Sequence, residues 1–411
     1  MNGQLQTGIQ TPAGPPTVNA RTARQWLAIA LGILVIGSGP RVSVAAEPFR
    51  VGAIFPFSGA IGIYGQSARR GIELAIEERG GTVAGRTIQV TWEDSETKPQ
   101  VAVQKASRLL ASGLDTLVGA GLSSETLALI PLAADAKVPH LVTLSADDRI
   151  TGSSKTRYTF RTNTPIGATN LMVSADLKAT GSKAVYAIAG DVGVLRDGWK
   201  QVRADITKAG LKVEGEDFPP IGNKDWAVLV EKIARSGADT VVFFGSSNDS
   251  IGFLKQAHEV GLSKRVRITG PFLLDDTIAK AVGAAAEGVQ SGLMYNAALD
   301  NAANKRFVAA YTKKFGEAPD MVAGEAYDGM AWWLDVVHRV GGTDKEKWID
   351  AFVVSTRPNS VKGLKKMRAC DNQAEQIGVM GIGVKGTAGQ QEVVMSVRQV
   401  VPAETLFTPC K

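Results

Sequence analysis

The sequence has few of the residues on which metal sites and nucleophilic catalysis depend. Its 411 residues include only two cysteines and three histidines, and His140, His258 and His338 are scattered along the chain. No cysteines and histidines have the spacing of a zinc site. The sequence also contains no nucleophile elbow, phosphate loop or His-Glu-x-x-His motif. We therefore expect no metal, no cofactor and no enzymatic activity.

The excess of positive over negative charge is also small. The formal net charge is +6, and three of the positive charges are arginines in residues 1–46, which contain no acidic residue. Residues 47–411 therefore carry only +3, with lysine and arginine mixed among glutamate and aspartate. Such a weak, mixed charge is typical of a solvated surface and not of a nucleic-acid-binding face. We expect no nucleic-acid partner.

The apolar run near the N-terminus is too short to span a membrane. It occupies residues 26–36, follows Arg21 and Arg24, and precedes a Gly/Pro breaker and a small-residue stretch that ends at Ala46. A transmembrane helix needs roughly 20 apolar residues, whereas this order of positive, apolar and small residues is that of a secretory signal peptide. We expect residues 1–46 to be a signal peptide that is cleaved near Ala46. A membrane anchor is the alternative.

The two cysteines, Cys370 and Cys410, both lie late in the chain. In an exported protein an even number of cysteines favours a disulfide. We expect these two to be joined, with two free thiols as the alternative. Closing a loop of this size would stabilise the fold by roughly 3–4 kcal/mol through restriction of the unfolded chain.

Residues 47–411 alternate apolar strand patterns with amphipathic helix patterns, and this length favours two domains. Eight strand patterns are present, at 50–55, 88–92, 116–118, 138–144, 184–189, 213–218, 240–244 and 266–269. Helix patterns include 124–136, 196–209, 226–236, 251–260, 304–315 and 322–340, and another strand follows Gly288. Repeated strand–helix–strand units build doubly wound parallel sheets with helices on both faces. The restart of the pattern near residue 184 predicts two similar α/β lobes.

Small hydroxyl side chains follow one predicted strand in each half. Ser123 and Ser124 come after the strand at 116–118, and Ser246 and Ser247 come after the strand at 240–244. Each pair opens a predicted helix, where a hydroxyl and the free N–H groups of the first turn can hold a carboxylate. Plain helix capping is the alternative.

Two adjacent acidic pairs also follow predicted strands, at Asp147–Asp148 and Asp275–Asp276. Ligands of open sheets bind at this end of the strands, but neighbouring carboxylates on a loop do not make a catalytic pair. We expect each pair to lie in a solvated turn.

A series of short motifs extends over nearly the whole of residues 47–411. It comprises residues 51–59, 64–65, 71–76, 119–126, 158–162, 190–191, 225–226 and 324–329. In order and spacing this series resembles type 1 periplasmic binding proteins of the leucine/isoleucine/valine-binding kind, which deliver substrate to ABC importers. The resemblance implies a periplasmic substrate-binding protein, monomeric, with an ABC permease of the inner membrane as its partner.

The resemblance also implies a fold of two doubly wound α/β lobes joined by a hinge of three crossings. Lobe one would comprise residues 47–165 and 290–369, and lobe two residues 166–289 and 370–411. The ligand would lie between the lobes and shift their population toward a closed state, which the permease would recognise.

Site residues follow from the same resemblance. In the amino-acid binders, the loop that corresponds to Ser123 and Ser124 holds the ligand carboxylate through a hydroxyl and backbone N–H groups. The loop that corresponds to Ser145 and Ala146 assists, and an aromatic side chain at the position of Tyr64 packs on the ligand.

This chain departs from the amino-acid binders at four positions. Asp147 stands where those proteins have a hydroxyl, and it would repel a carboxylate unless its side chain points away. Phe272 stands at the position of the acid that pairs with the ligand's ammonium group. Leu195 and Ser247 correspond to two aromatic residues that face this ammonium group. An ammonium ion buried without a partner costs several kcal/mol.

We therefore expect the ligand to be an organic acid with an apolar or aromatic body. It would be held by Ser123 and Ser145 and packed on Tyr64, Leu195 and Phe272. A branched-chain amino acid, with Asp191 or Asp249 replacing the missing acid, is the first alternative, and an amide is another. A role as a ligand-sensing partner of a membrane receptor is an alternative to transport.

Overall fold

The computed structural model describes residues 46–59, 61–387, 389 and 391–410, together with Asn2, Gly8, Ala13 and Gly14. The apolar run of the predicted signal peptide lies outside the described residues. No described helix is long and apolar enough to cross a membrane.

The first part of the chain forms a six-stranded sheet. Its strands lie in the order β2-β3-β1-β4-β5-β6. They are β1 (Phe49–Phe55), β2 (Thr82–Val83), β3 (Arg86–Asp94), β4 (Thr116–Gly119), β5 (His140–Val142) and β6 (Thr159–Arg161). All pairs are parallel except the edge pair of β2 with β3. Strand β1 lies inside the sheet and is buried over nearly its whole length, as its continuous apolar run predicts.

The helices of this part of the structure are α2 (Ile63–Glu77), α3 (Pro99–Ala111), α4 (Ser123–Asp135), α10 (Ala302–Phe315), α11 (Met321–Val340) and α12 (Lys345–Val353). They pack on the sheet or, like α10, on other helices. The longest of them, α11, packs along α2. A Cβ atom added to Gly71 of α2 would lie 2.3 Å from the carbonyl oxygen of Ala323 in α11, so glycine permits the close approach of these two helices. Aromatic side chains of α11 and α12 complete the core, with Trp333 edge-to-face on Trp348 and Phe352.

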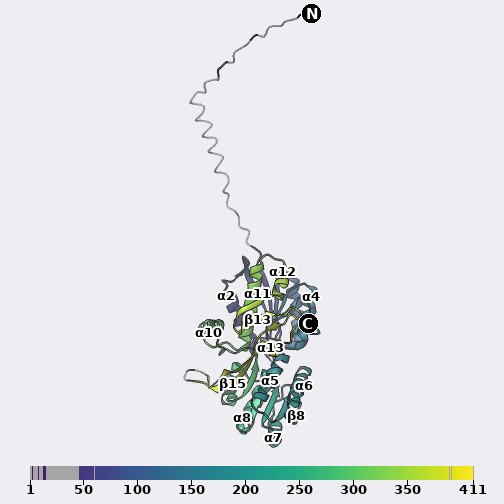
Figure 1. Ribbon diagram of the computed structural model, residues 1–411, viewed down its shortest axis with the longest axis vertical. Coiled ribbons are helices and arrows are strands. Elements are labelled where there is room, and N and C mark those ends of the chain that lie inside the picture. Colours follow the sequence, from purple (N-terminus) through teal and green to yellow (C-terminus); the bar gives the residue numbers. More distant parts are fainter. Residues whose placement is uncertain are drawn as a thin grey trace. The chain divides into compact units, whose positions relative to one another are not determined.

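A second, four-stranded parallel sheet follows in the order β10-β9-β7-β8. Its strands are β7 (Ala184–Ala189), β8 (Lys212–Asp217), β9 (Thr240–Phe244) and β10 (Arg267–Thr269). The helices of this part are α5 (Ile166–Ala179), α6 (Gly193–Lys208), α7 (Ala227–Arg235), α8 (Ser247–Glu259) and α9 (Asp276–Val282). Within residues 47–411, Figure 1 shows α2, α11 and α12 at one end and α6, α7 and α8 at the other.

All eight predicted strands are present. One strand and one helix differ in their bounds from the prediction. The predicted strand 138–144 narrows to β5, because the chain leaves the sheet after Val142 to form the loop that contains Ser145. Helix α8 begins at Ser247 and not at residue 251, because Ser246 and Asp249 form a capping box at its start.

The C-terminal strands were not predicted. Strands β15 (Gly378–Lys385) and β16 (Val393–Val401) form an antiparallel sheet with β11 (Gln290–Leu293). A smaller antiparallel sheet joins β12 (Thr356–Ser360), β13 (Gly363–Met367) and β14 (Ala374–Glu375). Short helices complete the described chain: η1 (Asp148–Ile150), η2 (Leu262–Lys264), η3 (Gly283–Ala286) and α13 (Ala403–Leu406).

Cys370 and Cys410 are joined by a disulfide, as predicted, with their Cα atoms 5.7 Å apart. The bond closes a sequence separation of 40 residues. Just before it, Leu406 and Phe407 pack against Met172 of α5. The C-terminal tail is therefore attached to the fold both covalently and by apolar contacts.

Candidate functional site

A cavity of about 510 Å³ lies between the C-terminal ends of strands of the two parallel sheets. All eight residues predicted to bind ligand line it: Tyr64, Ser123, Ser124, Ser145, Ala146, Leu195, Ser247 and Phe272. A somewhat larger hollow, of about 610 Å³, lies beneath the C-terminal tail but contains none of these residues. We call the 510 Å³ cavity the cleft.

The N-terminus of α4 forms one wall of the cleft. Ser123 is the first residue of this helix, and the preceding Leu122 has no side-chain oxygen with which to cap the free N–H groups. The hydroxyl of Ser123 instead accepts a hydrogen bond of 3.2 Å from the N–H of Asp147. The alternative of plain capping by Ser123 is therefore wrong. The first turn of α4 keeps N–H groups that suit an anion.

Ser145 lines the same wall, but its hydroxyl is already occupied. It lies 2.6 Å from Thr126 Oγ1 and 2.9 Å from the carbonyl oxygen of Ala120. The side chain is buried. Its single hydroxyl hydrogen is therefore used within the protein, where it stabilises the loop before α4.

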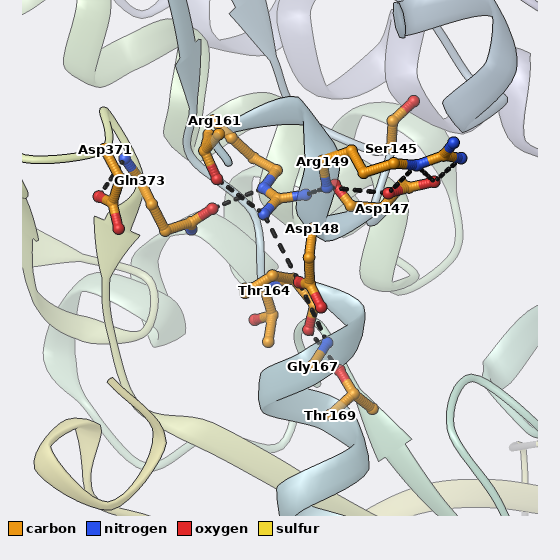
Figure 2. A network of polar contacts seen from close by, with 12 residues as sticks. Ser145, Asp147, Asp148, Arg149, Arg161, Thr164, Gly167, Thr169, Asp371 and Gln373 are labelled. Carbon is orange, nitrogen blue, oxygen red and sulfur yellow. Dashed lines mark hydrogen bonds and ion pairs between the residues drawn. The ribbon is translucent and has the colours of Figure 1, made fainter. Parts of the chain in front are cut away.

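Asp147 points away from the cleft. Both of its carboxylate oxygens accept hydrogen bonds from Arg149, at 2.9 Å from the backbone N–H and 2.5 Å from Nη2 (Figure 2). Burial raises the pKa of Asp147, but the hydrogen bonds from Arg149 outweigh it and hold this pKa below its usual range. Asp147 is buried, so the expected solvated turn is wrong for this residue, whereas Asp148 is exposed.

Arg161 is a residue whose role the sequence did not reveal. It is 1% exposed and donates to the carbonyl oxygen of Asp147 at 2.6 Å and to Thr151 Oγ1 at 3.0 Å. Figure 2 shows its guanidinium group at the centre of this network, with Gln373 on the other side. Burial lowers the pKa of Arg161 to about 10, which leaves it charged at neutral pH. Arg161 thus fixes the loop that carries Ser145 and Ala146.

The opposite wall of the cleft is built by α6 and α8. Ser246 caps α8 because its Oγ accepts a hydrogen bond of 3.3 Å from the backbone N–H of Asp249, so plain capping is the correct interpretation for this residue. Ser247 donates a hydrogen bond of 3.2 Å to the Tyr64 hydroxyl and so joins the two walls. Leu195 of α6 contributes an apolar side chain to the same wall.

No described residue that lines the cleft carries a charged side chain. The two acids considered as partners for an ammonium group are engaged elsewhere. Asp249 accepts from the backbone N–H of Gly222 at 2.9 Å as well as capping α8. Asp191 is exposed and forms an ion pair of 2.6 Å with Arg196.

Phe272 lies in the cleft in an unusual backbone conformation. Its φ angle is +54°, which bulky residues rarely adopt. A hydrogen bond of 2.9 Å from its N–H to the carbonyl oxygen of Gly292 holds this conformation. Strained backbone of this kind occurs mainly at binding and catalytic sites.

A family model described as periplasmic binding protein matches residues 48–381. The chain belongs to the periplasmic binding protein family. It is similar to the Leu/Ile/Val-binding protein homolog 6 of Brucella suis biovar 1 (strain 1330), with 27% identity over 331 residues, 79% of this chain and 84% of the relative. It is also similar to a leucine-, isoleucine-, valine-, threonine- and alanine-binding protein of Pseudomonas aeruginosa, with 26% identity over 340 residues, 81% of this chain and 89% of the relative.

Solved structures agree with this assignment. A solute-binding protein of an ABC transporter from Rhodopseudomonas palustris BisB5, in complex with 3,4-dihydroxybenzoic acid, is 27% identical with a TM-score of 0.79 and covers 87% of this chain and 98% of its own. The leucine-binding protein LivK of Thermotoga maritima is 21% identical with a TM-score of 0.77, over 86% and 98% of the two chains. The protein has the two-lobe α/β fold of type 1 periplasmic binding proteins and is a substrate-binding protein of an ABC transporter.

In this binding protein Asp275 lies directly behind Tyr64. It is 1% exposed and caps α9 through a hydrogen bond of 2.8 Å from the N–H of Ile278. Its Oδ2 atom has no hydrogen-bond partner among the described residues. Burial, and then the nearby charge of Asp320, raise the pKa of Asp275 to about 7. The solvated turn expected here is therefore wrong, because the start of α9 packs against the start of α11, where Thr277 donates to Asp320 at 3.0 Å.

The described residues of the binding protein contain no group of three or more His, Cys, Asp and Glu side chains that could hold a metal ion. His140 is fully buried in β5. Burial lowers its pKa to about 4, so it is neutral at physiological pH.

Proposed function

We propose that this binding protein captures a small organic acid with an apolar or aromatic body and delivers it to its ABC importer. The observation that carries the proposal is the absence of charged side chains from the described lining of the cleft, combined with the start of α4, where the Glu125 carboxylate takes the N–H of Leu122 but no side chain of Leu122 caps the N–H groups of Ser123 and Ser124. A carboxylate suits those N–H groups, whereas the ammonium group of an amino acid would find no acid to pair with.

The apolar part of the ligand would pack between the two walls. Tyr64 and Leu195 approach from different walls, and Phe272 closes the space between them. An aromatic ring placed among such side chains buries a large apolar area without needing a charge partner. The relative from Rhodopseudomonas palustris, which holds 3,4-dihydroxybenzoic acid, supports this ligand class.

A branched-chain amino acid is the second candidate ligand, because the curated relatives carry names of leucine-, isoleucine- and valine-binding proteins. It would require an ammonium partner that the described lining of the cleft does not provide. Titration calorimetry with 3,4-dihydroxybenzoate, benzoate and leucine separates the two. We expect an aromatic acid to bind and leucine not to bind; tight leucine binding would refute the proposal.

The mode of capture belongs to the same proposal. The ligand would lie between lobes of residues 47–165 with 290–369 and residues 166–289 with 370–411, and the hydrogen bond from Ser247 to Tyr64 would help to hold the closed state. The protein would be exported by cleavage near Ala46 and would act as a monomer in the periplasm. Scattering profiles with and without the ligand test the closure, and mass spectrometry of the secreted protein tests the cleavage.

The role of the α4 N–H groups is tested by replacing Ser123. Ser123→Ala removes only the hydroxyl, whereas Ser123→Pro also removes the N–H group, at a first-turn position where proline is tolerated. If N–H groups hold the carboxylate, Ser123→Pro weakens binding about 10-fold or more, roughly the loss of one charge-assisted hydrogen bond, and Ser123→Ala weakens it less. Ala302→Pro, at the exposed first position of α10, is the matched control and leaves binding unchanged. Equal affinity of both Ser123 variants would contradict this role.

The role of Phe272 is tested by Phe272→Ala. Losing the ring removes apolar contact with the ligand, and we expect the dissociation constant of an aromatic acid to rise about 10-fold. Phe315→Ala removes a half-buried ring of α10 that does not line the cleft and serves as the control. A Phe272→Ala variant that binds like the control would show that this ring does not touch the ligand.

A further inference from the structure

The motif at residues 324–329 has no contact with the cleft, although it belongs to the series that identifies the family. It lies in the buried first half of α11. Glu325 and Asp328 of this motif are 0% exposed. A carboxylate is rarely buried so completely unless it is paired.

The partners of these acids come from the β12–β13 hairpin. Lys365 Nζ lies 2.7 Å from Glu325 Oε2 and 3.0 Å from Asp328 Oδ2, and Lys362 Nζ lies 3.3 Å from Glu325 Oε1. The side chains of both lysines are also fully buried. We call these four residues the ion cluster.

The ion cluster holds the segment 162–165, which leads from β6 of the first sheet to α5 of the second part. Lys365 Nζ donates to the carbonyl oxygen of Thr162 at 3.1 Å, and Lys362 Nζ donates to Thr164 Oγ1 at 2.9 Å. Gln373 Nε2 donates to the carbonyl oxygen of Asn163 at 2.9 Å. Buried side chains therefore replace the water that would otherwise solvate this irregular segment.

The same segment reaches the cleft. The Asn163 side chain donates to the carbonyl oxygens of Leu144 and Ser145, at 3.2 Å each. Leu144 and Ser145 both line the cleft. A continuous chain of contacts thus runs from α11 through the lysines and residues 162–164 to one wall of the ligand site.

The glycine at the end of the motif is explained by the same arrangement. A Cβ atom on Gly329 would lie 2.4 Å from Thr162 Oγ1. A side chain at this position would push α11 off the segment. The motif therefore combines two buried acids with a glycine that allows the helix to pack closely against residue 162.

We propose that Glu325, Lys362 and Lys365 are positioning residues for ligand capture, because they fix residues 162–164 and thereby the 144–146 wall of the cleft. This inference rests on the proposed function insofar as the cleft is the ligand site. The ion cluster would then hold the 144–146 wall in its binding conformation before the ligand arrives, which lowers the cost of ordering this wall on binding.

The test uses two mild variants and a matched control. Thr164→Val removes the hydroxyl that accepts from Lys362, and Lys362→Met removes the amine but leaves the Lys365–Glu325 pair. Thr116→Val is the control: it removes a buried hydroxyl, at the start of β4, that accepts from Trp333 Nε1 at 2.8 Å. All three variants lower stability, but only the first two break the chain of contacts to the cleft.

Two readouts separate a positioning role from a merely structural one. In the ligand-free protein, hydrogen exchange of the amides at 144–147 should be at least 5-fold faster in Thr164→Val and Lys362→Met than in the wild type, and unchanged in Thr116→Val. The dissociation constant for 3,4-dihydroxybenzoate should rise about 3- to 10-fold in the first two variants only. Exchange at 144–147 that matches the control would overturn the proposal.

The exchange experiment needs no ligand. If the wild type does not bind 3,4-dihydroxybenzoate, the proposed ligand class fails while the exchange rates still decide the role of the ion cluster. Glu325→Gln would extend the test by removing the shared acid; if this variant does not fold, the two milder variants still give the answer.

Discussion

Replacing Asp275 by asparagine should stabilise the protein at neutral and alkaline pH but not in acid. Asp275 is buried behind Tyr64, and one of its carboxylate oxygens has no partner among the described residues. The side-chain oxygen of asparagine can still cap α9 by accepting from the N–H of Ile278, since asparagine caps helices as well as aspartate does. The substitution therefore removes a charge and keeps the hydrogen bond.

The direction of this pH dependence follows from how tightly the folded and unfolded protein bind the proton of Asp275. Burial and the charge of Asp320 raise the pKa of Asp275 from 3.8 to about 7, so the folded protein holds this proton more tightly than the unfolded chain does. Between pH 4 and pH 7 the unfolded chain loses this proton first, so the contribution of Asp275 to the stability of the wild type falls as pH rises. Such a shift corresponds to about 4 kcal/mol once the folded carboxyl is ionised. Relaxation around the ionised group reduces this cost, and we expect a gain of about 2 kcal/mol for Asp275→Asn at pH 8.

Urea denaturation at pH 4.5 and pH 8 measures the effect. The free energy of unfolding of Asp275→Asn should exceed that of the wild type at pH 8, and the difference should shrink to a small value at pH 4.5. Asp300→Asn is the control, because Asp300 is exposed and pairs with Lys305 at 2.6 Å. A gain that is the same at both pH values, or a loss at pH 8, would refute the argument.

Further predictions concern the disulfide and two glycines. Replacing Cys370 and Cys410 by serine should lower the free energy of unfolding by about 3–4 kcal/mol, because the bond closes a separation of 40 residues; chemical denaturation with and without reductant checks this, and a reductant effect on the double variant would contradict it. Gly65→Ala should lower the yield of folded protein sharply, since its Cβ would lie 1.9 Å from a backbone oxygen. Gly193→Ala, where a Cβ would meet nothing within 4 Å, should leave stability unchanged or raise it by up to about 1 kcal/mol in a thermal melt.

The alternation of apolar strands and amphipathic helices was enough to predict the two parallel sheets. Buried parallel strands such as β1 and β9 are continuous apolar runs, and this signal does not depend on distant contacts. The C-terminal strands were missed for the opposite reason. Strand β12, for example, has the sequence Thr-Arg-Pro-Asn-Ser and only one buried residue, so it owes its conformation to its neighbours.

The residues predicted to bind ligand come together in space, and their role in binding stays a prediction. All eight line one cavity, because loops at the C-terminal ends of parallel strands converge there. What the sequence did not reveal is where each polar group points. The Ser145 hydroxyl turns to Thr126, and the Asp147 carboxylate turns to Arg149. These directions depend on contacts between segments that are far apart in the chain, as does the burial of Asp275.

An uncharged lining has a consequence for the medium in which the protein works. A carboxylic acid is already an anion above about pH 5, and backbone amides neither gain nor lose protons. Salt screens interactions between formal charges strongly but has less effect on short hydrogen bonds inside a closed space. A binding protein built in this way would keep nearly the same affinity for its ligand while the pH and the ionic strength of its surroundings change.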